Sequence, residues 1–235
     1  MAKKRITRKE LVKKPDEFIT LTGAVIQWAQ KNTKSLAYGV GTFFIIVLLL
    51  AGYRFYAENR ERAAGALLSQ SITAYEEALR HEKTPVEALA KVQPDLERLI
   101  DDFAGCDAGN LGRVFYAHIC LSGAMPDRAI ELYTKAMDHL KADSSLSNAL
   151  LNGLAMAYIQ KGDHAAAIGY FEKLLDSSSA VLKDAALFHL GRLYLSAGDV
   201  QKSRHVYDQL STDFPDSMYA NIAREKGAGR EKPAV

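Results

Sequence analysis

Cysteine is scarce in this 235-residue chain, which contains only Cys106 and Cys120. Two cysteines are too few for a disulfide scaffold, and their separation does not match the spacing of metal ligands. The sequence also lacks the HExxH, GxSxG, GxGxxG, P-loop and CxxCH patterns, and its six histidines are scattered. No stretch alternates apolar and polar residues for long enough to indicate a β-strand. These absences predict an all-α protein that is not an enzyme and holds no metal or cofactor.

A large excess of one charge is also missing, because 30 basic and 28 acidic residues leave a net charge of +2. The distribution is uneven, since residues 1–34 hold nine Lys or Arg against three Asp or Glu, a net of +6. The remaining residues carry 21 basic and 25 acidic groups, a net of −4. A slightly acidic body is a poor match for the phosphate backbone of a nucleic acid. We therefore expect no nucleic acid among the partners of this protein.

Long apolar runs are few, but one extends from Leu36 to Tyr53. Its 18 residues carry no formal charge, and a helix of that length spans about 27 Å, close to the hydrocarbon thickness of a bilayer. A cleaved signal peptide and a buried core helix are the competing interpretations. The 35 residues that precede the run are too many for the short basic start of a signal peptide. The run also lacks a polar stripe, and both observations favour a transmembrane helix over residues 35–56.

Charge asymmetry predicts the orientation of this helix. The basic residues before it would stay in the cytoplasm, so the residues after the span would lie on the other side of the membrane. Residues 1–34 are then a basic cytoplasmic tail that contains a short amphipathic helix. Two roles for this helix stay open: it lies on the lipid surface, or it only leads into the span while the charges fix topology. Its apolar positions are Phe18, Leu21, Val25, Ile26 and Trp28.

The body contains internal repeats. Two segments that begin at Asn148 and Asp184 align with a period of 36 residues, so that Tyr158 matches Tyr194. A weaker copy lies upstream of them. Residues 58–82 and 86–104 have the apolar spacing of two helices and form a divergent opening repeat, and a final short helix begins near residue 221.

These segments resemble the tetratricopeptide repeat (TPR), a helix–turn–helix unit, which implies an α-solenoid over residues 57–226 and a flexible tail over 227–235. Small and large residues alternate at the positions where the two helices of a repeat cross. The dipeptides Gly162-Asp163 and Gly198-Asp199 predict turns in which glycine ends one helix and aspartate begins the next. The signature positions of the better-matched copy are Leu190, Gly191, Tyr194, Ser203, Tyr207, Leu210 and Pro215.

The family's geometry implies a concave surface lined by the first helix of each repeat, suited to an extended peptide or a partner helix. The competing interpretation is that these residues pack an added helix and bind nothing. The residues of this predicted protein-binding groove are Val114, His118, Leu121, Asn152, Met156, Ile159, Phe188, Arg192 and Leu195.

The state of the two cysteines depends on the compartment. On the oxidising side of a membrane, Cys106 and Cys120 can form a disulfide. Cys106 lies in a glycine-rich turn, however, and Cys120 falls where a repeat core is expected, which favours two separate thiols.

One N-terminal span followed by a TPR body resembles the YfgM-like family of bacterial inner-membrane proteins. The resemblance implies a single-pass protein of the bacterial inner (cell) membrane with a cytoplasmic N-terminus and a periplasmic C-terminal domain. It also implies a non-enzymatic scaffold at the Sec translocon that links translocated client polypeptides to a periplasmic chaperone. The alternative is a structural or assembly component of another envelope complex, in cell division, polysaccharide export or outer-membrane assembly. The segment Asp213-Phe214-Pro215-Asp216-Ser217 resembles repeats of envelope-assembly TPR proteins as well.

Overall fold

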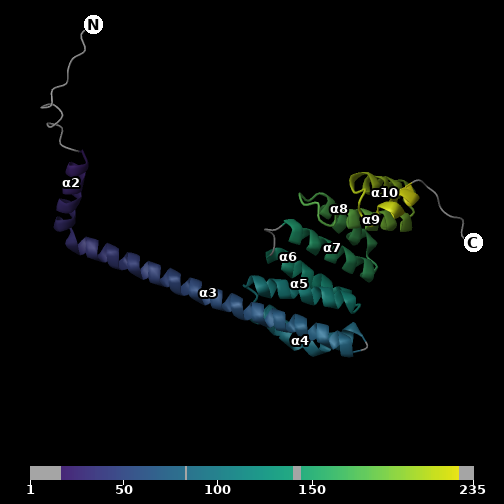
Figure 1. The fold of residues 1–235 in the computed structure, drawn as a ribbon, viewed down its shortest axis with the longest axis horizontal. Coiled ribbons are helices and arrows are strands. Elements are labelled where there is room, and N and C mark those ends of the chain that lie inside the picture. The colour runs from purple at the N-terminus through teal and green to yellow at the C-terminus, as the bar shows by residue number, and fades with distance from the viewer. Residues whose placement is uncertain (1–16, 83, 140–143, 228–235) are drawn as a thin grey trace, which may run out of the picture. The chain divides into compact units, whose positions relative to one another are not determined.

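The computed structural model describes residues 17–82, 84–139 and 144–227 (Figure 1). Within those ranges, every element of secondary structure is a helix. The chain divides into two compact units, Met1–Glu58 and Asn59–Val235. The basic residues 1–14 and the tail residues 228–235 lie outside the described residues. The helices are α2 (Glu17–Lys31), α3 (Thr33–His81), α4 (Pro85–Asp102), α5 (Asp107–Ser122), α6 (Pro126–His139), α7 (Ser144–Lys161), α8 (His164–Leu175), α9 (Lys183–Ser196), α10 (Val200–Asp213) and α11 (Ala220–Gly227).

The first unit consists of α2 and the first part of α3, which meet at Asn32. The side-chain amide of Asn32 donates to the carbonyl oxygen of Trp28 at 2.9 Å, and its own carbonyl accepts from the amide of Leu36 at 2.9 Å. The bond from Leu36 has the spacing of an ordinary helical bond, so the local feature at the break is the side-chain bond of Asn32 to Trp28. Asparagine is a weak helix former because its side chain makes such bonds to the backbone, and the helix is interrupted at this residue. The helix that the sequence predicts before the span is therefore a separate element.

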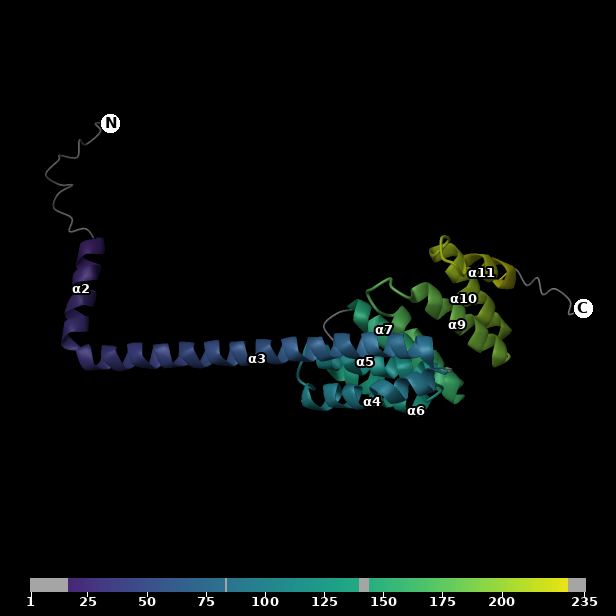
Figure 2. The same cartoon turned by 60° about the horizontal axis from the view of Figure 1, so that its bottom comes forward.

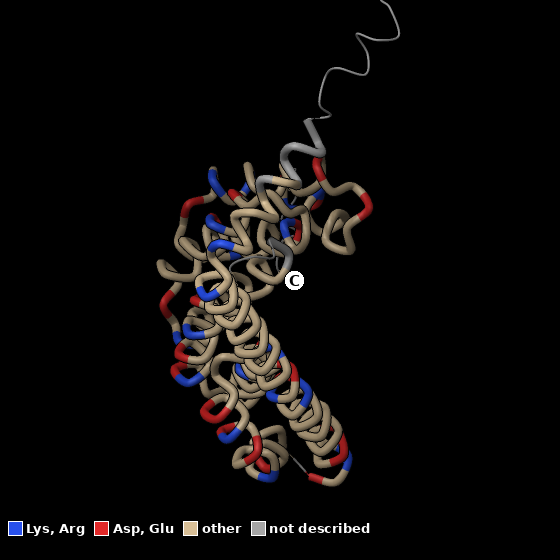
Figure 3. Tube along the Cα trace, turned by 90° about the vertical axis from the view of Figure 1, so that its left-hand side faces the viewer, with Lys and Arg blue, Asp and Glu red and all other residues tan. Residues whose placement is uncertain are grey.

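The apolar run forms the early part of α3, and this helix is long and apolar enough to cross a membrane, with a mean hydropathy of 2.1 over its most apolar window. Its large apolar side chains are exposed, Leu48 by 69% and Leu49 by 68%. Figure 3 shows this stretch free of charged residues, whereas both signs of charge are mixed over the second unit. Exposure on every face is what lipid contact requires and what a soluble core helix would not show.

The helix that contains the apolar run does not end near residue 56, where the sequence predicts the end of the span. α3 continues without a break to His81, so the expected span and the expected helix over 58–82 are one element. No proline lies between Tyr53 and His81, and the residues after Tyr56 are mostly Ala, Glu, Arg and Leu, which are strong helix formers.

The second unit is a stack of helical hairpins. α5 pairs with α6, α7 with α8, and α9 with α10, and α11 packs on α10 (Figure 2). The part of α3 after Asn59 lies beside α4, and its Tyr75 belongs to the same buried cluster as Leu89 and Val92 of α4. Each hairpin also contacts the next one along the chain, as α6 does with α7 and α8 with α9. This architecture confirms the prediction of an all-α, TPR-like solenoid. The expected final helix is present, and it includes Gly227, one residue beyond the predicted boundary.

The turns inside the hairpins have the predicted chemistry. Gly162 and Gly198 have φ of 85° and 80°, the left-handed conformation that glycine adopts without a Cβ penalty. The side chains of Asp163 and Asp199 then cap the next helix, each accepting from a backbone N–H three residues on at 3.0 Å. The equivalent turn between α5 and α6 has Ala124 in the left-handed position, with φ of 56°.

Aromatic residues of one helix fill the space that a glycine leaves on the neighbouring helix. A Cβ at Gly191 would lie 2.5 Å from Cζ of Tyr207, and one at Gly153 would lie 2.5 Å from Cζ of Tyr133. Only a hydrogen fits at these two positions, because real Cβ contacts essentially never come below 3.0 Å. The small and large residues therefore pack as the repeat pattern predicted.

The N-terminus of α5 is capped by a residue far away in sequence. The carboxylate of Glu61, on α3, accepts hydrogen bonds from the backbone amides of Asp107 and Ala108 at 2.9 and 2.7 Å. These amides have no partner inside their own helix, and the N-cap residue Cys106 makes no side-chain cap. Glu61 thereby fixes α5, the first helix of the groove, to α3.

Candidate protein-binding groove

Three neighbouring cavities run along the first helices of three consecutive hairpins, α5, α7 and α9. We call these cavities together the groove. The first and second share Met156, and the second and third share Arg192 and Ser196. The groove is therefore continuous along the stack, as a site for an extended or helical segment must be.

The first cavity has a volume of about 500 Å³ and lies between α5 and α7. Its walls are almost entirely apolar, and its polar groups come from His118 and Asn152. The side-chain amide of Gln160 donates to the carbonyl oxygen of Leu121 at 3.0 Å and ties α7 to α5 beside it. The lining residues are Val114, Phe115, His118, Leu121, Tyr133, Ala149, Asn152, Gly153, Met156 and Leu182.

The second and third cavities are smaller, about 200 and 320 Å³. The second lies between α7 and α9, and the third lies against α9, α10 and α11. The second is lined by Met156, Ile159, His164, His189, Arg192, Leu193 and Ser196, and the third by Phe188, Arg192, Leu195, Ser196, Tyr207, Ile222 and Lys226.

All nine residues of the predicted groove line these three cavities. Val114, His118, Leu121, Asn152 and Met156 line the first cavity. Ile159 lines the second, and the third is lined by Phe188 and Leu195. Arg192 lies at the boundary of the second and third. That these residues bind a protein segment stays a prediction.

Other lining residues were missed by the sequence analysis. Phe115 is three residues before His118, and His189 is three before Arg192, so helical spacing could have found both. Leu182 could not be found in this way, because it precedes α9 with φ of 65° and reaches the cavity from a loop.

One polar atom in the groove lacks a partner. Oδ1 of Asn152 is buried and accepts no hydrogen bond from any described residue. A buried carbonyl oxygen without a donor is unfavourable by about 1–3 kcal/mol.

The far end of the groove is aromatic. The ring of Phe188 stacks on that of Tyr219 with centroids 4.5 Å apart and an interplanar angle of 16°. The guanidinium of Arg192 lies over the same Phe188 ring, with Cζ 5.9 Å from the ring centroid, within the range of a cation–π contact. Rigid aromatic rings beside an arginine are typical of the residues that dominate binding energy at protein interfaces.

The charge of the groove is positive. Arg192 and Lys226 line it, and no Asp or Glu does so among the residues that the structure describes. Burial, followed by the nearby Arg192 charge, lowers the pKa of His189, so this ring is neutral near pH 7. The groove is suited to apolar segments that are neutral or acidic.

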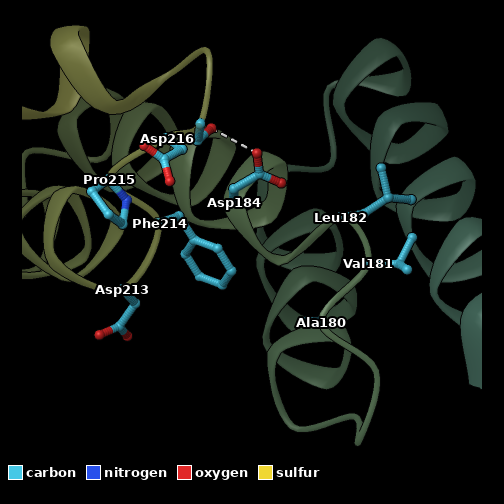
Figure 4. Close-up of a pocket in the computed structure, with 9 residues that line it drawn as sticks. Ala180, Val181, Leu182, Asp184, Asp213, Phe214, Pro215 and Asp216 are labelled. Atoms are coloured by element: carbon cyan, nitrogen blue, oxygen red, sulfur yellow. Dashed lines mark hydrogen bonds between the residues drawn. The ribbon is translucent and has the colours of Figure 1, made fainter.

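A fourth cavity of about 540 Å³ lies outside the groove, between the loop before α9 and the turn after α10 (Figure 4). Its wall contains the segment Asp213-Phe214-Pro215-Asp216-Ser217 that the sequence analysis singled out. The hydroxyl of Ser217 donates to Oδ2 of Asp184 at 2.6 Å, which closes one side. In contrast to the groove, this cavity presents the carboxylates of Asp184, Asp213 and Asp216.

The two cysteines are separate buried thiols in the structure. Cys120 packs in the cluster formed by α3 to α7, and Cys106 packs in a smaller cluster with Ala64 and Leu99. Burial raises the pKa of Cys120 to about 11. A thiol with so high a pKa is a structural group and not a nucleophile at neutral pH.

Comparison with known proteins agrees with this architecture. Two tetratricopeptide repeat family models match, one over residues 125–181 and the other over residues 158–225. Together they cover α6 to α11, whereas the divergent hairpin of α3 and α4 lies outside both. No curated protein matches the chain. The second unit therefore contains tetratricopeptide repeats, which generally serve as scaffolds for protein–protein interaction.

Solved structures with a similar fold are also TPR proteins. TPR-like repeats from Podosopora anserina match with a TM-score of 0.53 and 16% identity, over 69% of this chain and 85% of that chain. A tetratricopeptide repeat protein from Parabacteroides merdae matches with a TM-score of 0.54 and 16% identity, over 70% of this chain. The chain spans 61% of the length of that second protein. At this identity the likeness concerns the fold alone.

Proposed function

We propose that the protein is a membrane-anchored TPR scaffold that binds segments of other proteins in the groove. The observation that carries the proposal is the continuity of the three cavities along α5, α7 and α9. Their apolar walls and their aromatic end with Arg192 support binding of a peptide segment.

The anchor gives the groove its location. The uncharged run in α3 holds the body at a membrane surface, and the basic residues before it keep the N-terminus in the cytoplasm. Tethering raises the local concentration of the groove near membrane-bound partners without adding a contact.

Within this function, we favour a place beside the Sec translocon, in the manner of the YfgM-like family that the architecture resembles. The groove would receive translocated client polypeptides and bring them to a periplasmic chaperone. A scaffold of another envelope complex would use the same groove for a different partner.

Site-specific photocrosslinking in intact membranes tests this function. A photoreactive amino acid is placed at Met156, shared by the first two cavities, and in a matched sample at Gln201, which is exposed on α10 and does not line the groove. We expect adducts from position 156 that are absent from position 201. Equal adducts at both positions would contradict binding in the groove.

The identity of the adducts separates the two partnerships. Translocon subunits, a chaperone and nascent secreted chains support the first, and division, export or outer-membrane assembly proteins support the second. The Met156→Glu variant should lose these partners, while Gln201→Glu, which adds the same charge outside the groove, should retain them.

A further inference from the structure

The helix before the span has an apolar face without a partner in the structure. Val25, Ile26 and Trp28 of α2 are exposed by 55%, 57% and 58%. Val25 and Trp28 are three residues apart and share one face of the helix, with Ile26 beside them. Three large apolar side chains exposed on a 15-residue helix would be unfavourable in water.

The opposite face of α2 is polar. Gln27 lies about half a helical turn from the face of Val25, and Lys31 ends the helix on the polar side. Such a helix has the composition of an element that lies in the plane of a lipid surface, with apolar residues toward the acyl chains and polar ones toward water.

Two further observations select lipid as the partner of this face. The apolar run begins at Leu36, only five residues after Lys31, so insertion of the run brings α2 to the membrane surface. Lys31 and Lys34 flank the junction, and their charge suits the anionic headgroups of a cytoplasmic leaflet. Tryptophan is itself enriched at the membrane–water interface, where its ring is apolar and its N–H stays hydrated.

The junction at Asn32 allows this placement. Because α2 ends there and α3 begins, α2 does not have to continue along the axis of the span. We propose that α2 is an interfacial helix that binds the anionic lipid surface through Val25, Ile26 and Trp28. This inference rests on the proposed membrane anchoring and adds a second, flat contact with the same bilayer.

Trp28 is the only tryptophan of the chain, so its fluorescence reports on α2 alone. The full-length protein is reconstituted into vesicles of phosphatidylcholine with phosphatidylglycerol. We expect a blue-shifted emission, weak quenching by acrylamide, and stronger quenching by lipids brominated near the headgroup than by lipids brominated near the chain end. Emission at the wavelength of exposed tryptophan with full acrylamide quenching would overturn the proposal.

A tryptophan scan distinguishes a flat helix from one that simply stands near the span. In a Trp28→Phe background, Val25→Trp and Gln27→Trp place one tryptophan on each face. A flat helix predicts that position 25 is protected from acrylamide several-fold better than position 27. A helix that rises from the surface predicts the reverse, because position 27 is nearer to the span, and that result would overturn the proposal.

Extraction with alkaline carbonate separates this inference from the function on which it rests. If the protein stays in the vesicles and Trp28 is accessible to acrylamide, the interfacial helix is wrong and the anchored scaffold stands. If carbonate releases the intact protein, the anchoring itself is wrong and the interfacial helix is overturned with it. Retention together with protected Trp28 supports both.

Discussion

The imidazole ring of His189 lies parallel to the phenyl ring of Phe171, with centroids 5.4 Å apart and an interplanar angle of 6°. The pair joins α8 of one hairpin to α9 of the next, directly beside the second cavity of the groove. In the preceding pair of hairpins, the corresponding ring of Tyr133 packs against Gly153. One aromatic position per hairpin therefore determines how closely the next hairpin approaches.

The stacked His189 ring predicts that the stability of the body depends on pH. Burial and Arg192 lower the pKa of His189 below its ordinary value of 6.5, so the unfolded chain binds the proton more readily than the folded one. The contribution of the neutral His189 ring to the stability of the body is fully present above pH 6.5 and is lost as the pH falls below that value. Urea unfolding of the body, residues 59–235, at pH 7.5 and 5.0 should show a smaller acid loss for His189→Phe than for the wild type. His205→Phe, at an exposed position, is the control, and equal losses in all three would contradict the assignment.

The close approach of α9 and α10 depends on Gly191. A methyl group there would lie 2.5 Å from Cζ of Tyr207, so Gly191→Ala should destabilise the body by about 1–3 kcal/mol. Gly169→Ala is the matched control, because a Cβ at Gly169 meets nothing within 4 Å. It should be neutral or stabilise α8 by up to about 1 kcal/mol. Denaturant unfolding measures both, and similar effects would show that helix propensity and not packing decides the outcome.

The turn between α5 and α6 places an alanine in a backbone conformation that alanine tolerates poorly. Ala124 has φ of 56°, so Ala124→Gly should stabilise the body by about 0.5–1 kcal/mol. The reverse change in the equivalent turn, Gly198→Ala, should destabilise it by about 1 kcal/mol, since φ there is 80°. If both variants changed the melting temperature in the same direction, the left-handed conformation of one of these residues would be contradicted.

Buried thiols predict slow modification. Burial raises the pKa of Cys106 and brings that of Cys120 to about 11, which leaves little thiolate in the folded body at pH 8. A thiol reagent should therefore react with both at least about tenfold more slowly in buffer than in urea. In urea without reductant, two thiols should titrate. Their absence would mean that Cys106 and Cys120 are joined as a disulfide.

The repeats could be predicted from sequence because their turns and crossings depend on local chemistry. The Gly-Asp dipeptides, the small residues at the helix crossings and Pro215 after α10 each indicate a turn, a crossing or a helix end from a few neighbouring residues. The TPR pattern is confirmed by the family models over residues 125–225. The positions along the groove followed from the geometry that the resemblance to the TPR family implies.

Other features depend on contacts between distant parts of the chain. The cap that Glu61 supplies to α5 joins residues 46 apart, and nothing near Cys106 indicates it. Leu182 reaches the first cavity through a left-handed loop conformation that its sequence does not favour. The continuity of α3 was missed because the apolar run and the helix after it differ in composition, although no helix breaker separates them.

Protease accessibility in intact spheroplasts tests most directly that a membrane-anchored groove faces away from the cytoplasm. With one epitope tag at each end of the full-length chain, added protease should destroy the body after Tyr56 and leave the N-terminal tag protected until the membrane is lysed. A protected body and a digested N-terminus, or a chain that is protected throughout, would contradict the account.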